Sequence, residues 1–194
     1  MINLVDKDKK LLLTIARKTL RNALRLEEFD LSFVNVPNKL KENGASFVTL
    51  TIRGRLRGCI GALSAYQSLV QDVCEHVLAA AFDDPRFQPL TAGEEKLVEI
   101  EISYLTPPEV IAYDTLDDLL SQLEPGRHGV ILSDGFRRAT YLPQVWDQLP
   151  KKEEFLGSLC QKMGGRRNLW KDKKLKVETY LAIHFSENEF PLIP

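Results

Sequence analysis

Hydrophobic residues recur at helical spacing in four stretches of the chain. In residues 7–26 an apolar stripe runs from Leu12 to Leu24, which predicts an amphipathic helix with Asp6 as its N-terminal cap. Similar patterns predict helices over residues 69–81, 115–123 and 151–163, the last of them ended by Gly164 and Gly165.

Other stretches carry the shorter period of β-strands. Residues 46–52 are rich in β-formers, and in residues 98–104 apolar residues alternate with polar ones. Residues 129–142 predict a hairpin with a tight turn at Asp134-Gly135, and residues 174–185 predict a last strand. The elements lack a strand–helix–strand rhythm, so we expect an α+β fold with a largely antiparallel sheet and packed helices.

Composition narrows the class of protein. A chain of 194 residues suits a single domain over 1–194 or two tightly joined subdomains. The net charge of −1 argues against a broad basic surface for duplex nucleic acid, while a local basic patch stays open. Three cysteines argue against a disulfide framework, and neither a signal peptide nor a membrane-length apolar stretch is present. We therefore expect a cytoplasmic protein without a membrane partner.

The run Leu-Arg-Gly-Cys-Ile-Gly at residues 56–61 is the most informative motif. Arg57 next to Cys59 would favour a reactive thiolate, while Gly58 and Gly61 would let the backbone turn sharply or approach a ligand closely. The same residues could also form a bulged strand with one buried cysteine. Spacing alone leaves both interpretations open.

This run resembles the signature of the AMMECR family, the AMME chromosomal region candidate proteins. Further matches follow in the same order along the chain, namely residues 84–87 with Pro89, 98–105, 128–129, 134–135, 142–145 and 159–160. The family usually has threonine after the second glycine, where this chain has Ala62.

The resemblance implies an AMMECR-like fold and a role as the A component of the AmmeMemoRadiSam system. Its partners would then be a Memo-like protein and a radical SAM enzyme in a modification pathway. The resemblance does not imply a particular reaction. We expect no resident cofactor and no metal, because three histidines and three cysteines show no ligand spacing.

The segment Asp84-Pro85-Arg86-Phe87 has two interpretations. It could be a turn in which Asp84 pairs with Arg86, or Arg86 could hold an anionic ligand with its planar guanidinium. We also place His128, which lies in a predicted loop, and Gln144 among the residues that contact the ligand.

Other polar residues receive plainer interpretations. Cys74, Cys160 and His184 are predicted to pack in the protein, and Glu99 and Glu101 to lie on a solvated strand face. Arg53, Arg55 and Arg57 would share one face of an extended segment, and residues 166–174 would form a charged loop.

Two functional hypotheses follow. In the first, Cys59 is the catalytic nucleophile of an enzyme or enzyme subunit, in a cleft with Arg57 and Arg86 that takes an anionic substrate. In the second, the same cleft is a non-catalytic ligand-binding or adaptor module. Both predict that residues 57–59 and 84–87 share one site and that Gly58 and Gly61 are structurally necessary.

Overall fold

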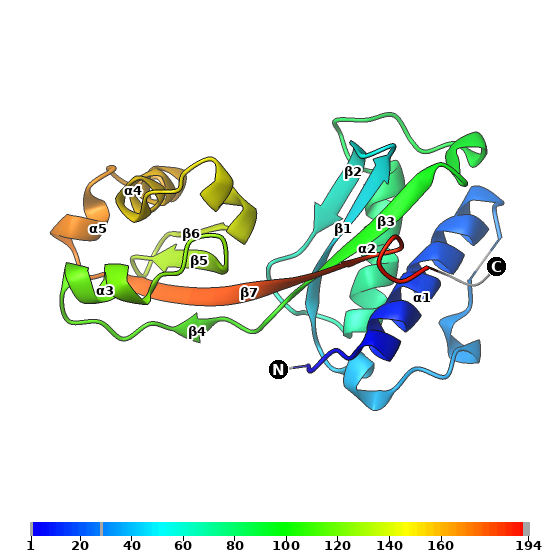
Figure 1. Ribbon diagram of the computed structural model, residues 1–194, viewed down its shortest axis with the longest axis horizontal. Coiled ribbons are helices and arrows are strands. Elements are labelled where there is room, and N and C mark those ends of the chain that lie inside the picture. Colours follow the sequence, from blue (N-terminus) through cyan, green and yellow to red (C-terminus); the bar gives the residue numbers. More distant parts are fainter. Residues whose placement is uncertain (1, 28, 192–194) are drawn as a thin grey trace. The chain divides into compact units, whose positions relative to one another are not determined.

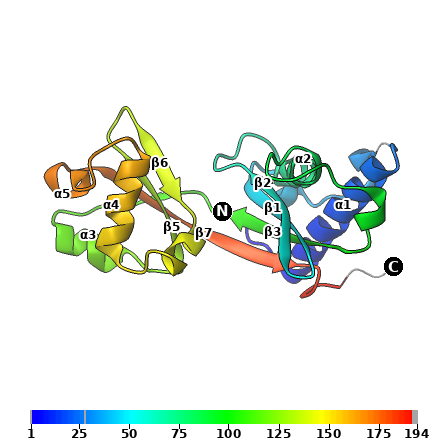
Figure 2. The same cartoon turned by 90° about the horizontal axis from the view of Figure 1, so that it is seen from above.

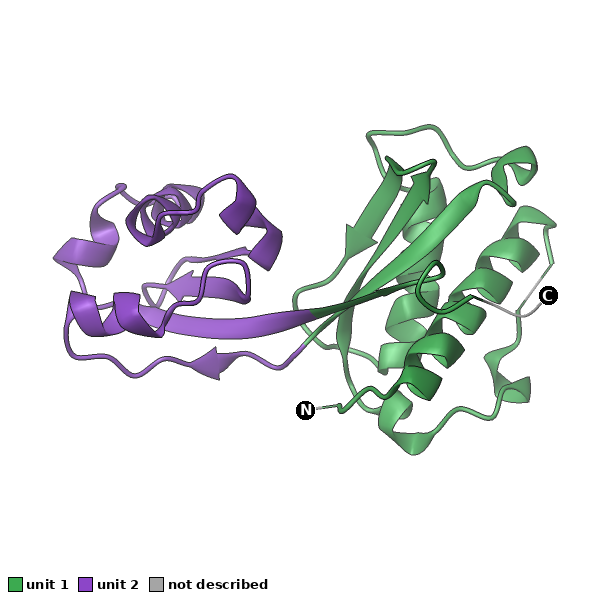
Figure 3. Cartoon of the chain, viewed as in Figure 1, with its two compact units in different colours: residues 1–105, 183–194 green, residues 106–182 purple. Residues whose placement is uncertain are grey.

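The computed structural model describes residues 2–27 and 29–191. They form two compact units, of which unit 1 holds residues 1–105 and 183–194 and unit 2 holds residues 106–182 (Figure 3). Unit 1 contains α1 (Asp6–Leu24), β1 (Ala45–Ile52), β2 (Arg55–Gly61), α2 (Leu69–Phe82) and β3 (Val98–Leu105). It also contains three short 3₁₀ helices, Leu31–Phe33, Asn38–Lys41 and Ala92–Glu94.

The sheet of unit 1 is antiparallel, in the order β2-β1-β3 (Figure 1). One face of this sheet packs against α1 and α2, because Val48, Leu50, Ile100 and Ile102 alternate onto that face and are fully buried there. Thr49, Cys59 and Glu101 lie in register with one another on the opposite face. The two helices thus leave the face that carries Cys59 uncovered.

Unit 2 has its own core of aliphatic and aromatic side chains. Its sheet has the order β4-β7-β5-β6, and α4 packs beside β6 (Figure 2). Trp146 stacks on Phe155 with their ring centroids 3.6 Å apart. The elements are β4 (Glu109–Val110), α3 (Leu116–Gln122), β5 (His128–Ser133), β6 (Arg138–Tyr141), the 3₁₀ helix Pro143–Asp147, α4 (Lys152–Lys162), α5 (Leu169–Asp172) and β7 (Lys176–Ser186), whose last residues belong to unit 1.

The predicted α+β class is confirmed, and every strand pairing given for the described residues is antiparallel. Several local predictions were wrong. The N-cap of α1 is Val5, whose backbone N–H donates to Asp8, so Asp6 is the first helical residue. The predicted hairpin of β5 and β6 is present, by contrast, with Gly135 in the turn at positive φ (99°) and the Asp134 N–H donating to the Arg137 carbonyl oxygen at 3.2 Å. Residues 166–174 contain the short helix α5.

Candidate functional site

The cysteine motif forms β2, the second strand of a hairpin. Arg53 (φ 52°) and Gly54 (φ 72°) make the turn from β1. The prediction that Arg53 shares one extended face with Arg55 and Arg57 is therefore wrong. The register passes from Leu50 opposite Gly58 to Thr51 opposite Leu56, which leaves Arg57 as the extra residue of a β-bulge. The motif is therefore a bulged strand, but its cysteine is half-buried rather than buried.

The two glycines of the motif serve close packing rather than a turn, because neither has positive φ. A Cβ on Gly58 would lie 2.0 Å from the carbonyl oxygen of Ala80 in α2. A Cβ on Gly61 would lie 2.3 Å from the ring of Phe47 and 2.4 Å from the carbonyl oxygen of Ser46. Both positions therefore lack room for any side chain, and Gly58 brings β2 directly onto α2.

Cys59 points away from α2, because it follows Gly58 on an alternating strand. Its side chain is half-buried, and the Thr49 hydroxyl on β1 donates to its sulfur at 3.3 Å. Among the described residues, Thr49 provides the only side-chain hydrogen bond to this sulfur. Within residues 2–27 and 29–191, no histidine or carboxylate is hydrogen-bonded to the thiol.

The backbone of Cys59 is held by the turn that follows α2. Its N–H donates to Oδ2 of Asp84 at 2.9 Å, and its carbonyl oxygen accepts from Nη2 of Arg86 at 3.3 Å. Asp84 is almost completely buried and binds the Arg86 guanidinium at both carboxylate oxygens, at 2.9 and 2.7 Å. Since β2 is an edge strand, these side chains satisfy backbone groups that a further strand would otherwise pair.

Arg57 is fixed by a second carboxylate. Its Nε lies 2.9 Å from Oε1 of Glu94, and its Nη2 lies 3.3 Å from both Oε2 of Glu94 and the carbonyl oxygen of Pro89. Its remaining nitrogen, Nη1, is buried and has no hydrogen-bond partner among the described residues. The guanidinium carbons of Arg57 and Arg86 lie 6.0 and 5.6 Å from the ring centroid of Phe87. Arg57, Cys59, Asp84 and Arg86 are thus brought together, as predicted.

Hydrogen bonds lower the pKa values of the Asp84 and Glu94 carboxyl groups. The Arg86 guanidinium, with the backbone N–H groups of Cys59 and Arg86, holds the pKa of Asp84 well below its usual range. The bond from Arg57, with the Thr91 backbone and hydroxyl, lowers the pKa of Glu94 to about 2. Both are therefore ionised at neutral pH, and each arginine of the site is paired with a negatively charged carboxylate.

His128 and Gln144 belong to unit 2. Nδ1 of His128 accepts from the Glu124 backbone N–H at 3.2 Å, and its carbonyl oxygen accepts from the Trp146 indole at 2.7 Å. Burial lowers the pKa of His128. Gln144 lies in the 3₁₀ helix Pro143–Asp147. Their assignment to the Cys59 site stays a prediction.

Two residues of the site were not foreseen. Thr49 faces Cys59 across the β1–β2 pair, and this follows only from the register. Glu94 had a readable signal, because Thr91 and Glu94 have the spacing of a capping box and do form one, with the Thr91 N–H donating to Glu94 at 2.9 Å. The sequence gives no sign that the same carboxylate binds Arg57.

The two histidines of unit 1 have polar partners of their own. On the open face of unit 1, Nδ1 of His184 lies 2.8 Å from the Ser103 hydroxyl and 3.9 Å from Glu101. On the helix side, Nδ1 of His76 lies 3.1 Å from Oδ2 of the buried Asp72. Within the described residues no cluster of three or more histidine, cysteine or acidic side chains could hold a metal ion.

A family model decides the relationship of the chain to known proteins. The AMMECR1 model matches residues 13–185, which covers most of both units. The chain belongs to the AMMECR1 family. The predicted resemblance is thereby confirmed.

Relatives of this AMMECR1-family chain occur in archaea. "Protein LS215_2104" of Saccharolobus islandicus is 36% identical over 188 residues, covering 92% of this chain and 81% of the relative. A protein of Methanothermobacter thermautotrophicus is 34% identical over 159 residues, covering 79% of this chain and 81% of the relative. The crystal structure of the uncharacterized protein PH0010 from Pyrococcus horikoshii aligns with a TM-score of 0.78 at 31% identity, covering 94% of this chain and 93% of that one.

None of the described helices combines the length and apolar character that a transmembrane span requires.

Proposed function

We propose that this AMMECR1-family protein is a ligand-binding or adaptor module of a modification pathway, and that the edge of unit 1 around Cys59 is its recognition site. Its proposed partners are a Memo-like protein and a radical SAM enzyme in the cytoplasm. The proposal rests on two hydrogen bonds to the backbone of Cys59: its N–H donates to Asp84, and its carbonyl oxygen accepts from Arg86.

The hydrogen bonds around Cys59 favour ligand recognition over nucleophilic catalysis. A cysteine nucleophile is usually activated by an adjacent base that takes the thiol proton. Here the Thr49 hydroxyl is a donor to the sulfur, and the nearby carboxylates Asp84 and Glu94 are engaged by arginines. The arrangement therefore fixes the position of Cys59 without supplying a route for its proton.

The site nevertheless has an unused donor. Arg57 Nη1 is buried and lacks a partner among the described residues, while the other two nitrogens of its guanidinium are occupied. A buried donor without an acceptor costs free energy, which a ligand oxygen at this position would recover. A carboxylate or phosphate group is the acceptor that a guanidinium binds most strongly. An anionic group on a small molecule or a modified side chain is thus the ligand class we propose.

Binding between purified proteins tests this function. The full chain would be titrated with the Memo-like and radical SAM proteins of the same organism, using biolayer interferometry. We expect saturable binding to at least one partner and a weakening of about tenfold in Arg57→Gln, the loss of one good charged hydrogen bond. Arg55→Gln is the matched control, because Arg55 is an exposed arginine on the same strand.

Failure of both partners to bind at tens of micromolar would reject the adaptor function, as would an equal loss in Arg57→Gln and Arg55→Gln. The enzyme hypothesis keeps one specific support, namely that the half-buried Cys59 thiol lies on the open sheet face rather than in the core. If the pathway's product forms with wild-type protein and not with Cys59→Ala, while partner binding stays intact, catalysis by Cys59 replaces the adaptor function.

A further inference from the structure

A hollow lies in unit 1, between the N-terminus of α2 and the segment that leads from α1 to β1. We call it the α2 groove, and its volume is about 450 Å³. Pockets that bind small molecules typically have 300–1,000 Å³, so the α2 groove has the size of a ligand site. Its lining consists of Leu31, Ser32, Val34, Val36, Lys41, Ser68, Val70 and Gln71.

The walls of the α2 groove are held by the core and by main-chain bonds. Val36 and Val70 are buried, with exposed fractions of 5% and 2%. The Leu69 N–H at the start of α2 donates to the Glu42 carbonyl at 2.9 Å, which joins the two walls beside Lys41. On the outer wall, Asp30 caps the 3₁₀ helix Leu31–Phe33 by accepting from the Ser32 N–H at 2.8 Å. The hollow is thus formed by the fold itself.

The chemistry of the lining has two parts. Four of the lining residues are aliphatic, namely Leu31, Val34, Val36 and Val70. Lys41 is the one charged residue of the lining, and it forms no hydrogen bond or ion pair within the described residues. An apolar surface beside a single uncompensated positive charge is complementary to a molecule with a hydrocarbon part and one negative charge.

We propose that the α2 groove is a binding site for an aliphatic carboxylate, with the hydrocarbon chain against the four aliphatic residues and the carboxylate at Lys41. The Ser68 hydroxyl donates to Oε1 of Gln71 at 2.7 Å, so the Gln71 amide N–H groups and the Ser32 hydroxyl are the donors that would hydrogen-bond the carboxylate. The α2 groove shares no residue with the site around Cys59, so this inference is independent of the proposed adaptor function.

Calorimetric titration of the full chain with octanoate tests the proposal. We expect saturable 1:1 binding, and a roughly fivefold weaker affinity in Lys41→Gln, which is typical for the loss of one exposed ion pair. Lys96→Gln is the matched control, since Lys96 is exposed in unit 1 but is not part of the lining. Octylamine has the same chain with a positive end and should not bind.

A second variant keeps the test decisive. Val34→Asp places a negative charge in the half-buried outer wall, so it should abolish octanoate binding while circular dichroism shows an unchanged fold. The proposal is overturned if octanoate does not bind at millimolar concentration, if octylamine binds equally well, or if Val34→Asp or Lys41→Gln binds octanoate like the wild type.

Discussion

The backbone N–H of Cys59 donates to Oδ2 of Asp84 at 2.9 Å, although 25 positions separate the two residues. Asp84 thereby joins the turn after α2 to the edge strand β2, and it does so with a carboxylate that is only 3% exposed. The hydrogen bond explains why two separate motifs of the family, residues 56–61 and 84–87, are parts of one structural unit.

Asp84→Asn should destabilise the protein by about 2 kcal/mol, because it removes the charge from a buried acceptor that serves both Cys59 and Arg86. Asp83→Asn is the matched control, since Asp83 is the preceding residue and is exposed. Urea unfolding of both variants measures the difference. An equal shift of the two midpoints would show that the bond to Cys59 contributes little to stability.

Low pH should reduce the stability that Asp84 and Glu94 contribute to the fold. The pKa of Asp84 lies well below its usual range and that of Glu94 at about 2, so both carboxylates hold fewer protons in the folded state than in the unfolded state. Their contribution to stability is complete above the unfolded pKa values of about 4 and is lost as the pH falls toward the folded values. We therefore expect the gap in unfolding free energy between wild type and the double variant Asp84→Asn, Glu94→Gln to shrink steadily from pH 5 to pH 2.5. A constant gap would contradict this.

Gly58→Ala should be strongly destabilising, by about 2–3 kcal/mol, because its methyl group meets the rigid backbone of α2 at Ala80. Gly61→Ala should also be destabilising, because the Ser46 carbonyl oxygen cannot move away from the new methyl group, but by less than Gly58→Ala, because the other close neighbour, the Phe47 ring, can shift. Gly93→Ala is the control, because a Cβ there meets nothing closer than 4.0 Å and φ is not positive. Thermal unfolding should rank the variants in this order. A neutral Gly58→Ala would mean that α2 moves freely on the sheet.

The sequence predicted the regular elements well, because their signals are local. The stripe from Leu12 to Leu24 identified α1, and the alternation in residues 98–104 identified β3. The strand β2 was harder to define, since its bulge at Arg57 breaks the alternation and two of its residues are glycines. The short strand β4 and the helix α5 are fixed by tertiary packing, which no local pattern reports.

The sequence predicted which residues form most of the candidate site, but it did not predict which carboxylate neutralises Arg57. The motifs indicated Arg57, Cys59, Asp84 and Arg86, and the pairing of Asp84 with Arg86 follows from their spacing of two residues. That Glu94 compensates Arg57 depends on a contact between segments 37 positions apart. Long-range contacts of this kind arise from the path of the chain after α2, for which one sequence contains no periodic signal.

Cys59 should react with iodoacetamide before the other two cysteines. Burial raises the pKa of both Cys74 and Cys160, and Cys160 is fully buried. Cys74 also accepts the Thr19 hydroxyl at 3.5 Å. Mass spectrometry of peptides after short labelling gives the order, with Cys59 first and Cys160 last. Labelling of Cys160 ahead of Cys59 would show that unit 2 opens more readily than the edge of unit 1.

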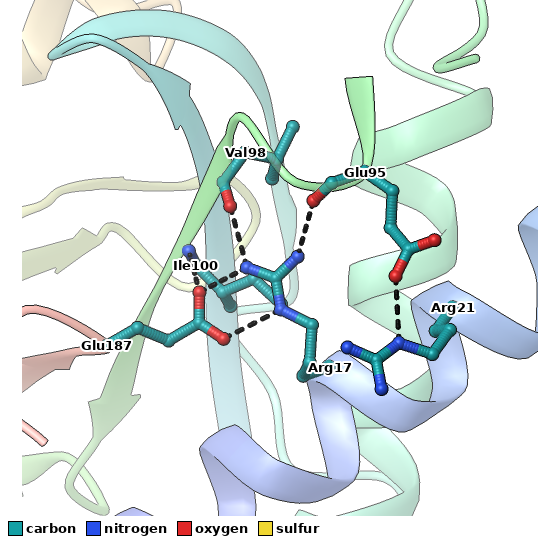
Figure 4. A network of polar contacts seen from close by, with 6 residues as sticks. All are labelled: Arg17, Arg21, Glu95, Val98, Ile100 and Glu187. Atoms are coloured by element: carbon teal, nitrogen blue, oxygen red, sulfur yellow. Dashed lines mark hydrogen bonds and ion pairs between the residues drawn. The ribbon is translucent and has the colours of Figure 1, made fainter. Parts of the chain in front are cut away.

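Glu187, the residue that follows β7, is joined to α1 by a network of polar contacts (Figure 4). Arg17 pairs with the Glu187 carboxylate, and its guanidinium also donates to the carbonyl oxygens of Glu95 at 3.0 Å and Val98 at 2.6 Å. Glu187 in turn accepts the Ile100 N–H at 2.9 Å. Both charged side chains are mostly buried, with 14% and 12% of their surface exposed.

Glu187→Gln should therefore cost about 3 kcal/mol, because it leaves the Arg17 charge buried without its counter-charge. The Arg21–Glu95 pair in the same network is the comparison: Glu95 is 14% exposed but the Arg21 side chain is 48% exposed, so Arg21→Gln should cost less than Glu187→Gln. Urea unfolding and hydrogen exchange at the Ile100 amide measure the two effects. Exchange at Ile100 should accelerate only in Glu187→Gln, because that carboxylate is its direct acceptor. If Arg21→Gln destabilises as much as Glu187→Gln, the network acts through surface charge, and the buried pair is not what holds β7 to the sheet.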